Sequence, residues 1–351
     1  VKPGNAWGSG DKCFLQNCFL GEKNNYHSQI LEPLLYTALA KQRADNYYKA
    51  LDCYIPFLNG GLFEAEYDWQ QSPIEIDNAV FKEIFETFDL YNFTVREDEP
   101  LEREVAVDPE MLGKVFEKLL DVQDRKSKGA FYTPREIVHY MCQESLIAYL
   151  ETHFENILRD DLAVFITKAE YSFERDQAKT LGTKSYDYGL PESIQGQAMA
   201  LDEALASIKI CDPAIGSGAF PVGLMQEIVK ARLALVPYLS GNIKSAYELK
   251  YDVIQNSIYG VDIDASAVDI AKLRLWLSLV VDEDDYETIK PLPNLDYKIV
   301  CGNALLGVEK DLLNEQLFKQ LESLKVLYFN EITSEKPKLK VKIETIISQL
   351  T

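Results

Sequence analysis

The sequence has few of the side chains from which most metal centres are built. Its 351 residues contain six cysteines and three histidines, and no two cysteines have Cys-x-x-Cys spacing. The histidines His27, His139 and His153 do not cluster with the cysteines either. We therefore expect no metal site, and we interpret the thiols as buried and reduced.

Long apolar runs are also missing. No stretch approaches the roughly 20 apolar residues that cross a bilayer, and no charged-then-apolar leader opens the chain. We expect a cytoplasmic protein without membrane contacts. The chain begins at Val1 rather than at a methionine, so we expect it to be a piece of a longer protein.

Positive charge is in short supply. Lysine and arginine together number 36 against 56 aspartates and glutamates, which gives a formal net charge of −20. Phosphate binding needs clustered Lys and Arg, so this balance argues against a nucleic-acid surface over the whole chain, although it permits a local groove. Hydrophobic residues make up 47% of the chain, which is ordinary for a globular protein, and the length predicts two or three domains.

The spacing of apolar residues in 1–125 predicts a mostly helical domain. Apolar residues recur with helical spacing over 28–43 and 79–88, and the segment 108–122 begins with an Asp-Pro step typical of a helix start. We expect the first 30 residues to be loop or poorly ordered. The stretch "IPFLNGGLFE" (55–64) predicts a turn anchored by apolar side chains.

The alternation of strand and helix patterns in residues 126–351 predicts an α/β domain. Thr133, Pro134 and Glu136 have the spacing of a capping box, so a helix is expected to start at Pro134. The polar stretch 152–199 predicts an insertion, with loop at 180–197. Strands are expected at 208–211 and 258–262, each followed by a helix, and a further short strand and turn at 297–307. The last 40 residues are expected to be helical. This alternation predicts right-handed crossovers and a largely parallel sheet.

Polar turns follow the three expected strands. The ends of parallel strands meet at one edge of a sheet, so a ligand there should meet Asp212 with Gly216 and Gly218, then Asp262, then Asn303. Pro221 replaces the third glycine of G-x-G-x-x-G, and an acidic Asp212 suits an ammonium better than a pyrophosphate. Both features favour S-adenosylmethionine over NAD. Taken singly, each turn could equally be a plain strand-to-helix connection with a helix-capping acid.

These segments resemble the adenine-N6 DNA methyltransferases in which motif X precedes motif I. "GAFYTP" (129–134), "DPAIGSGAF" (212–220) and "YGVDID" (259–264) are similar to motifs X, I and II, and "GNALL" (302–306) takes the place of motif III. The region 53–150 resembles the helical connector and methylase entry of type II (IIS or IIG-like) restriction–modification enzymes. The resemblance implies a helical N-terminal domain followed by part of a Rossmann-like, S-adenosylmethionine-dependent methyltransferase sheet, with DNA as partner of the intact enzyme.

The resemblance also implies roles for individual residues. Asp212 would hold the ammonium group of the cofactor, Asp262 the ribose, and Ile263 and Asn303 the adenine ring and its amino edge. Phe220 would support the turn. The cofactor contacts carried over in this way are Phe131, Tyr132, Thr133, Asp212, Ala214, Gly216, Gly218, Phe220, Asp262, Ile263, Asn303, Ala304 and Leu305.

The family's catalytic motif IV, Asn-Pro-Pro-Tyr, does not occur in this sequence. We therefore assign no catalytic residue, and we expect the chain to bind S-adenosylmethionine weakly or not at all and to be unable to methylate DNA alone. Without the strand that carries motif IV, the strand at 208–211 would be an edge, which we expect the C-terminal helices or another molecule to cover. The alternative function is a non-catalytic specificity or interaction module with the same fold; a nucleotide-dependent oxidoreductase is a third possibility.

Overall fold

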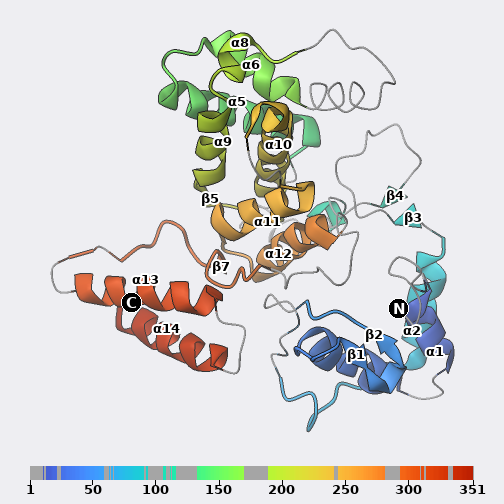
Figure 1. Cartoon of the computed structure of the whole chain (residues 1–351). Helices are drawn as coiled ribbons and strands as arrows, with labels where there is room; N and C mark the ends of the chain where they lie inside the picture. Colours follow the sequence, from blue (N-terminus) through green and yellow to red (C-terminus); the bar gives the residue numbers. More distant parts are fainter. Residues whose placement is uncertain are drawn as a thin grey trace.

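The computed structural model describes most of the chain, with gaps. The described residues are 11, 13–21, 25–58, 63, 65, 67–90, 92–93, 106–107, 111, 113–115, 133–169, 189–240, 244–280, 293–308, 310–311, 314–330 and 335–350. Figure 1 shows an N-terminal part (α1 to α2), a central part (α5 to β7) and a C-terminal helix pair (α13 and α14).

The N-terminal part is built around a helix over residues 26–39. It contains two π-helical segments, η1 (His27–Leu31) and η2 (Leu34–Leu39), and Pro33, which has no amide N–H, lies between them. The helix ends before residue 43, as the Arg43 guanidinium turns back and donates to the carbonyl of Ala38 (2.5 Å). A helix here was predicted, and its end is four residues earlier than expected.

Short elements complete this part. The strands β1 (Tyr47–Tyr48) and β2 (Cys53–Tyr54) pair antiparallel around the 3-10 turn η3 (Lys49–Leu51). The helix α2 (Asn78–Phe88) starts at Asp77, whose side chain accepts from the amide of Ala79 (2.9 Å), which confirms the helix expected at 79–88. A parallel pair, β3 (Asn92–Phe93) and β4 (Ala106–Val107), was not predicted.

The first 30 residues are not all loop. The helix α1 (Phe14–Gly21) forms there, and its Phe19 ring lies 5.4 Å from the ring of Tyr26, which is 1% exposed, and 5.4 Å from that of Phe85. The prediction was wrong because α1 packs against rings outside its own segment, one of which, that of Phe85, lies far along the chain. Most of the helix expected at 108–122 and part of the turn at 55–64 lie outside the described residues.

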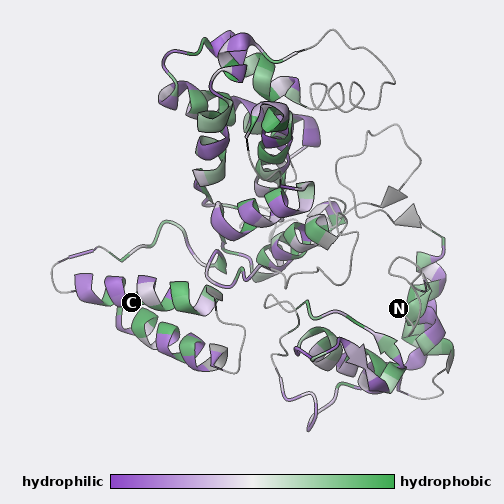
Figure 2. Ribbon diagram, in the orientation of Figure 1, coloured by the Kyte–Doolittle hydropathy of each residue, from purple (hydrophilic) through white to green (hydrophobic). Residues whose placement is uncertain are grey.

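The central part packs helices around a small sheet. Its helices are α5 (Arg135–His153), α6 (Arg159–Thr167), α8 (Glu192–Gln195), α9 (Ala198–Ser207), α10 (Ala219–Leu235), the 3-10 turn η4 (Val236–Tyr238), α11 (Ala246–Asn256) and α12 (Ala265–Val280). In Figure 2 α10 is mostly hydrophobic, as expected for a helix that packs against α5, α9 and α11.

The stretch expected to be an insertion supplies part of this core. Leu162 and Phe165 of α6 and Ile194 of α8 are fully buried in the same cluster as Met225 and Ile228 of α10. The described residues of 152–199 are thus packed helices and connections, with α8 inside the predicted loop 180–197. Weak periodicity concealed them because both helices are short. The boundary near residue 125 lies outside the described residues and stays a prediction.

The sheet is parallel, as predicted. Its strands β5 (Ile210–Asp212), β6 (Ile258–Asp262) and β7 (Ile299–Cys301) lie in the order β5-β6-β7. In the register, Asp212 is opposite Gly260, and Asp262 is opposite Cys301. Among the described residues, β5 pairs with β6 alone and is an edge strand.

The C-terminal helices lie at the other edge of the sheet. The predicted helical end forms α13 (Glu315–Asn330) and α14 (Lys336–Leu350), which pack against each other. The Tyr328 hydroxyl on α13 donates to Asp296 (2.6 Å), in the segment before β7. The expectation that these helices cover β5 is therefore wrong, because Tyr328 holds α13 on the β7 side. The alternative, that another molecule covers β5, stays a prediction.

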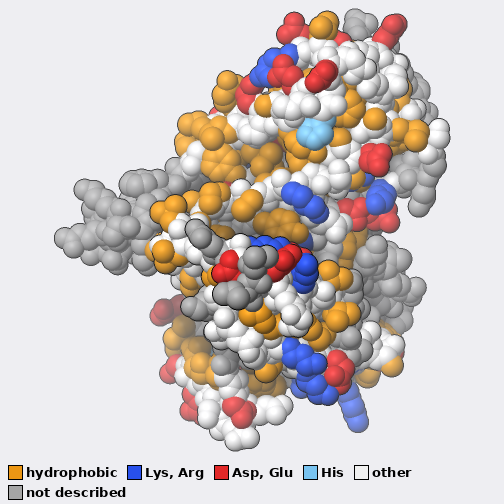
Figure 3. Space-filling model, turned by 90° about the vertical axis from the view of Figure 1, so that its left-hand side faces the viewer, with side chains coloured by type: hydrophobic (Ala, Val, Ile, Leu, Met, Phe, Trp, Pro, Cys, Tyr) orange, Lys and Arg blue, Asp and Glu red, His pale blue; other side chains and the backbone are white. Residues whose placement is uncertain are grey.

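Charges are mixed on the surface. On the face drawn in Figure 3, acidic and basic side chains are interspersed with hydrophobic ones. None of the described helices combines the length and apolar character needed to cross a bilayer.

Candidate functional site

The turn after β5 is held by its own aspartate. Asp212 ends the strand, and its Oδ1 accepts a hydrogen bond from the amide of Ala214 (3.0 Å). The turn closes through a bond from the amide of Gly218 to the carbonyl of Ile215 (2.9 Å), and α10 then begins at Ala219. Phe220 lies in the first turn of α10. The strand, turn and helix predicted from the sequence are confirmed.

The two glycines in this turn have different reasons to be glycine. Both have a positive φ, 53° at Gly216 and 85° at Gly218. Residues other than glycine rarely adopt such a backbone conformation. A Cβ on Gly218 would also lie 3.1 Å from Cα and Cβ of Ala271 on α12, whereas one on Gly216 would meet no atom of the described residues within 4 Å. Gly218 thus allows turn and helix to pack closely, and no described residue crowds Gly216.

Asp262 joins two strand ends. Its Oδ2 accepts from the amide of Gly216 (2.8 Å), and its Oδ1 accepts from the amide of Asp264 (2.9 Å). Asp264 in turn accepts from the amides of Ser266 (2.9 Å) and Ala267 (3.2 Å) and so caps α12. The carboxylate predicted to meet a ligand therefore also fixes the turn after β5.

The site is acidic. Burial, together with the nearby negative charge of Asp262, raises the pKa of Asp212, although the hydrogen bond from Ala214 opposes the shift. Two carboxylates that share one sheet edge favour a cationic group and disfavour a pyrophosphate.

The end of β7 adds apolar surface. The amide of Gly302 donates to the carbonyl of Asp262 (2.8 Å), which places Asn303 beside the end of β6. Asn303 Oδ1 accepts from the amide of Leu305 (3.0 Å), so this side chain shapes its own turn, in which Ala304 also lies. Ile263 is 60% exposed and Leu305 93% exposed. The edge thus offers both polar atoms and exposed apolar side chains.

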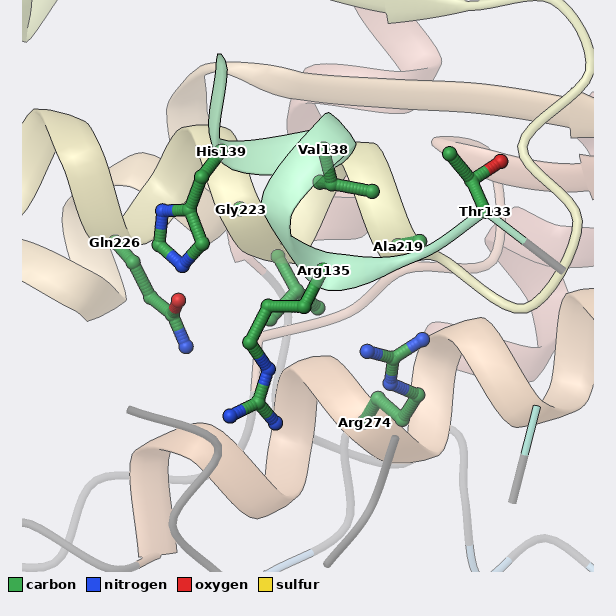
Figure 4. Close-up of a pocket in the computed structure, with 9 residues that line it drawn as sticks. Thr133, Arg135, Val138, His139, Ala219, Gly223, Gln226 and Arg274 are labelled. Carbon is green, nitrogen blue, oxygen red and sulfur yellow. The ribbon is translucent and has the colours of Figure 1, made fainter. Parts of the chain in front are cut away.

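The start of α5 lies beside the start of α10. Thr133 and Ala219 line one pocket, as do Arg135, Val138, His139, Val222, Gly223, Gln226 and Arg274; Figure 4 shows Thr133 on one side of it and His139 and Gln226 on the other. Pro134 is the N-cap of α5, with no side-chain cap bond. The predicted capping box is wrong because the helix starts one residue later, which moves Thr133 out of the capping position. Phe131 and Tyr132 lie outside the described residues.

Two buried charged side chains, one on α12 and one on α10, hold the elements around this site and were not identified from the sequence. Arg274 of α12 is 3% exposed and donates through Nη1 to the carbonyl of Ser217 in the turn (2.9 Å). Glu227 of α10, also 3% exposed, accepts from Gln143 (2.9 Å) and contacts His139 (3.0 Å), both on α5. A charged residue inside the apolar pattern of a helix is the signal that could have drawn attention to them.

The cysteines are free but not all buried. Cys53 and Cys142 are buried, whereas Cys13, Cys211 and Cys301 are exposed. The expectation of buried thiols is wrong for these three; Cys211 and Cys301 lie on the short strands β5 and β7, which nothing among the described residues covers at those positions. Within the described ranges, no three His, Cys, Asp or Glu side chains converge as a metal site.

Fold and site together define a class. A parallel sheet carries a glycine turn, two carboxylates and exposed apolar residues at the carboxyl ends of its strands, which is where α/β proteins bind cofactors. Comparison with known proteins makes the class more specific. Residues 192–324 match the family model described as MmeI, DNA-methyltransferase domain.

Three curated proteins are similar in sequence. Type II restriction enzyme and methyltransferase RM.MjaORFECS2P of Methanocaldococcus jannaschii is 34% identical over 81% of this chain and 24% of its own length. DNA methyltransferase A of Bacillus subtilis is 22% identical over 70% of this chain and 22% of its own length. Type II restriction enzyme and methyltransferase RM.Eco57I of Escherichia coli is 31% identical over 33% of this chain and 13% of its own length. The chain therefore spans a quarter or less of each.

A solved structure shares the fold. The type IIL restriction–modification enzyme MmeI, determined in complex with DNA, matches with a TM-score of 0.50 and 18% identity over 85% of this chain and 35% of that chain. Together these matches confirm the resemblance seen in the motifs: the chain corresponds to a methyltransferase portion of restriction–modification enzymes.

Proposed function

We propose that this chain is the methyl-donor-binding part of a DNA adenine-N6 methyltransferase of a restriction–modification system, with S-adenosylmethionine as donor. The observation that carries the proposal is the hydrogen bond from Gly216 to Asp262, which brings the turn after β5 and the acid after β6 to one sheet edge. The cofactor supplies an electrophilic methyl group. The residues of this chain bind and orient the group that carries it.

The residues present fit this cofactor. Asp212 offers a partly buried carboxylate for the ammonium group, and no described residue would lie within 4 Å of a Cβ on Gly216. Asp262 accepts one amide on each oxygen, and each carboxylate oxygen has a second lone pair for a ribose hydroxyl. Ile263 and Leu305 are exposed, as suits side chains that cover a flat purine ring.

The other assigned positions complete the proposed site. Backbone approach falls to Ala214, Gly216 and Gly218; Thr133, with Phe131 and Tyr132, would lie at the methionine end, and Asn303 and Ala304 at the amino edge of adenine. The chain supplies no Asn-Pro-Pro-Tyr segment to hold the target adenine against the methyl group. We therefore propose that DNA contact and methyl transfer belong to the intact enzyme.

Calorimetry with S-adenosylmethionine and with NAD tests which of the two cofactors the chain binds. We expect weak binding of the first and none of the second. Asp262→Ala should weaken binding by tenfold or more, since a hydrogen bond to a charged group is worth about 1.5–3 kcal/mol. Asp269→Ala, at an exposed aspartate on α12, is the matched control. Equal affinity of the wild type and Asp262→Ala would refute the ribose assignment.

Methyl transfer is tested with tritiated S-adenosylmethionine and double-stranded DNA. The isolated chain should transfer no label. Label on DNA that depends on Asp212 would show that the catalytic groups are present in this chain and would contradict the proposed division of roles.

A further inference from the structure

The turn after β5 is folded over β6 by one buried side chain. Ile215 is 3% exposed, although it lies in a loop. Its amide donates to the carbonyl of Val261 (3.0 Å), and the next amide, that of Gly216, donates to Asp262 (2.8 Å). These two bonds hold the turn against β6 beyond the end of β5.

Gly260 in β6 makes the space that Ile215 fills. A Cβ at this glycine would lie 2.3 Å from Cδ1 of Ile215 and 3.1 Å from its Cβ and Cγ1. The first distance is shorter than non-bonded carbon atoms tolerate, and the other two leave little room for a rotation of the side chain. Gly260 has no positive φ, so its backbone would accept another residue. The contact with Ile215 is what requires glycine here.

We propose that Gly260 and Ile215 form a seat that positions the donor turn, residues 212–218, and that Gly260 is a positioning residue for binding of the sulfonium methyl donor. This inference rests on the proposed function for the identity of the ligand. The seat matters because Gly260 lies opposite Asp212 in the sheet, and Ile215 lies beside Gly216. A side chain at position 260 pushes Ile215 outward and moves the turn away from Asp262.

The first test needs no ligand. Amide hydrogen exchange at Ile215 and Gly216, followed by NMR, reports the two bonds that hold the turn. Gly260→Ala should speed exchange at both amides by about tenfold or more, as expected for a local opening, and Gly260→Val should do so more strongly. Gly302→Ala is the matched control, because among the described residues a Cβ there would meet only Val261, at 4.0 Å.

Rescue separates positioning from a general loss of structure. Ile215→Val removes the Cδ1 atom that the new methyl group meets. The double variant Gly260→Ala, Ile215→Val should therefore restore slow exchange and should restore affinity for S-adenosylmethionine toward that of Ile215→Val alone. Each variant should still unfold in a single cooperative transition, and the midpoint that Gly260→Ala lowers through its clash with Ile215 should partly recover in the double variant.

The outcomes distinguish the two proposals. Unchanged exchange in Gly260→Ala, or no rescue by Ile215→Val, overturns the seat. If the exchange pattern is as expected while the wild type binds no S-adenosylmethionine, the seat stands and the proposed cofactor is wrong. If the wild type binds and Gly260→Ala binds equally well, the seat has no role in donor binding and the inference is refuted.

Discussion

At the scale of single residues, the two carboxylates of the site differ in their surroundings. Asp262 accepts an amide on each oxygen, from Gly216 and from Asp264, whereas Asp212 accepts from Ala214 within its own turn. Burial and the charge of Asp262 raise the pKa of Asp212. Asp212 should therefore take up a proton at a higher pH than an ordinary aspartate does.

Cofactor binding should consequently depend on pH. Because the pKa of Asp212 is raised, this side chain becomes neutral at a higher pH than an ordinary aspartate, and neutral Asp212 attracts an ammonium group less. Affinity for S-adenosylmethionine should fall as the pH is lowered through that pKa. Asp212→Asn should bind more weakly and lack this fall. Calorimetry at a series of decreasing pH values measures both, and parallel pH profiles of the two proteins would contradict the assignment.

Sequence patterns could indicate the charged residues of the site but not their contacts. Asp212 and Asp262 were predicted because each follows a strand, and the structure places both at one edge. The contact between Ile215 and Gly260 was not predictable, since it joins residues 45 positions apart. It depends on strand register, which no local pattern specifies.

At the scale of elements, α5 and α10 are joined by a buried polar group. Gly223 of α10 lets α5 approach closely, since a Cβ there would lie 2.9 Å from Val138 and 3.1 Å from Cys142. Four residues on, Glu227 binds Gln143 and contacts His139. Burial alone would raise the pKa of Glu227, but these hydrogen bonds and Lys230 outweigh it and lower the pKa.

Glu227→Gln should therefore destabilise the fold. The amide cannot accept from both partners as the carboxylate does, and we expect a loss of about 1–3 kcal/mol in free energy of unfolding. Since the folded-state pKa of Glu227 is lowered, its stabilising effect is present at neutral pH and disappears as the pH falls through that pKa. Urea unfolding at pH 7 measures the loss. Glu203→Gln, at an exposed position on α9, should change little, and equal stability of both variants would argue against the role of Glu227.

Elements were predictable where local signals agreed. The strand at 258–262 formed as expected. The helix after it and α2 also formed as expected, because in both an aspartate at the start precedes apolar residues at helical spacing. The helix α1 was missed because its stability comes from rings contributed by Tyr26 and Phe85. Helices α6 and α8 were missed because they are short, and burial against α10 stabilises them more than their own sequence does.

At the scale of the whole molecule, the C-terminal helices are attached through a buried lysine. Lys298 is 4% exposed and donates to the carbonyl of Gln255. Its ammonium lies 5.1 Å from the ring centroid of Tyr259 and 5.6 Å from that of Phe329 on α13. Burial, with a smaller effect of Lys209, lowers the pKa of Lys298 to about 8.

Lys298 should make the free energy of unfolding depend on pH in the alkaline range. Between about pH 8 and its ordinary value of 10.5, the unfolded chain holds a proton that the folded chain has lost, so the contribution of Lys298 to stability improves as pH rises. The stability of the wild type relative to Lys298→Met should therefore increase from pH 7 to pH 10. Denaturant unfolding at these pH values tests this, and a constant difference would show that Lys298 does not titrate there.

The edge strand β5 sets the association behaviour of the isolated chain. The amide of Ile210 donates to Ser257, so strand alternation turns the amide of Cys211 away from β6, and Cys211 is exposed. An unpaired edge favours pairing with another strand. We expect sedimentation velocity to show association that rises with concentration and that Cys211→Pro weakens. A wild type that stays monomeric at high concentration would contradict this.

The exposed thiol of Cys301 offers a way to measure ligand binding at the sheet edge by alkylation. Cys301 is opposite Asp262 in the sheet and exposed, while burial raises the pKa of Cys142 to about 12 and leaves that thiol inert. A ligand on Asp262 should slow alkylation of Cys301 but not that of Cys13, which lies in the N-terminal part. Peptide mass spectrometry can therefore read occupancy of the site in the unlabelled, unmutated chain.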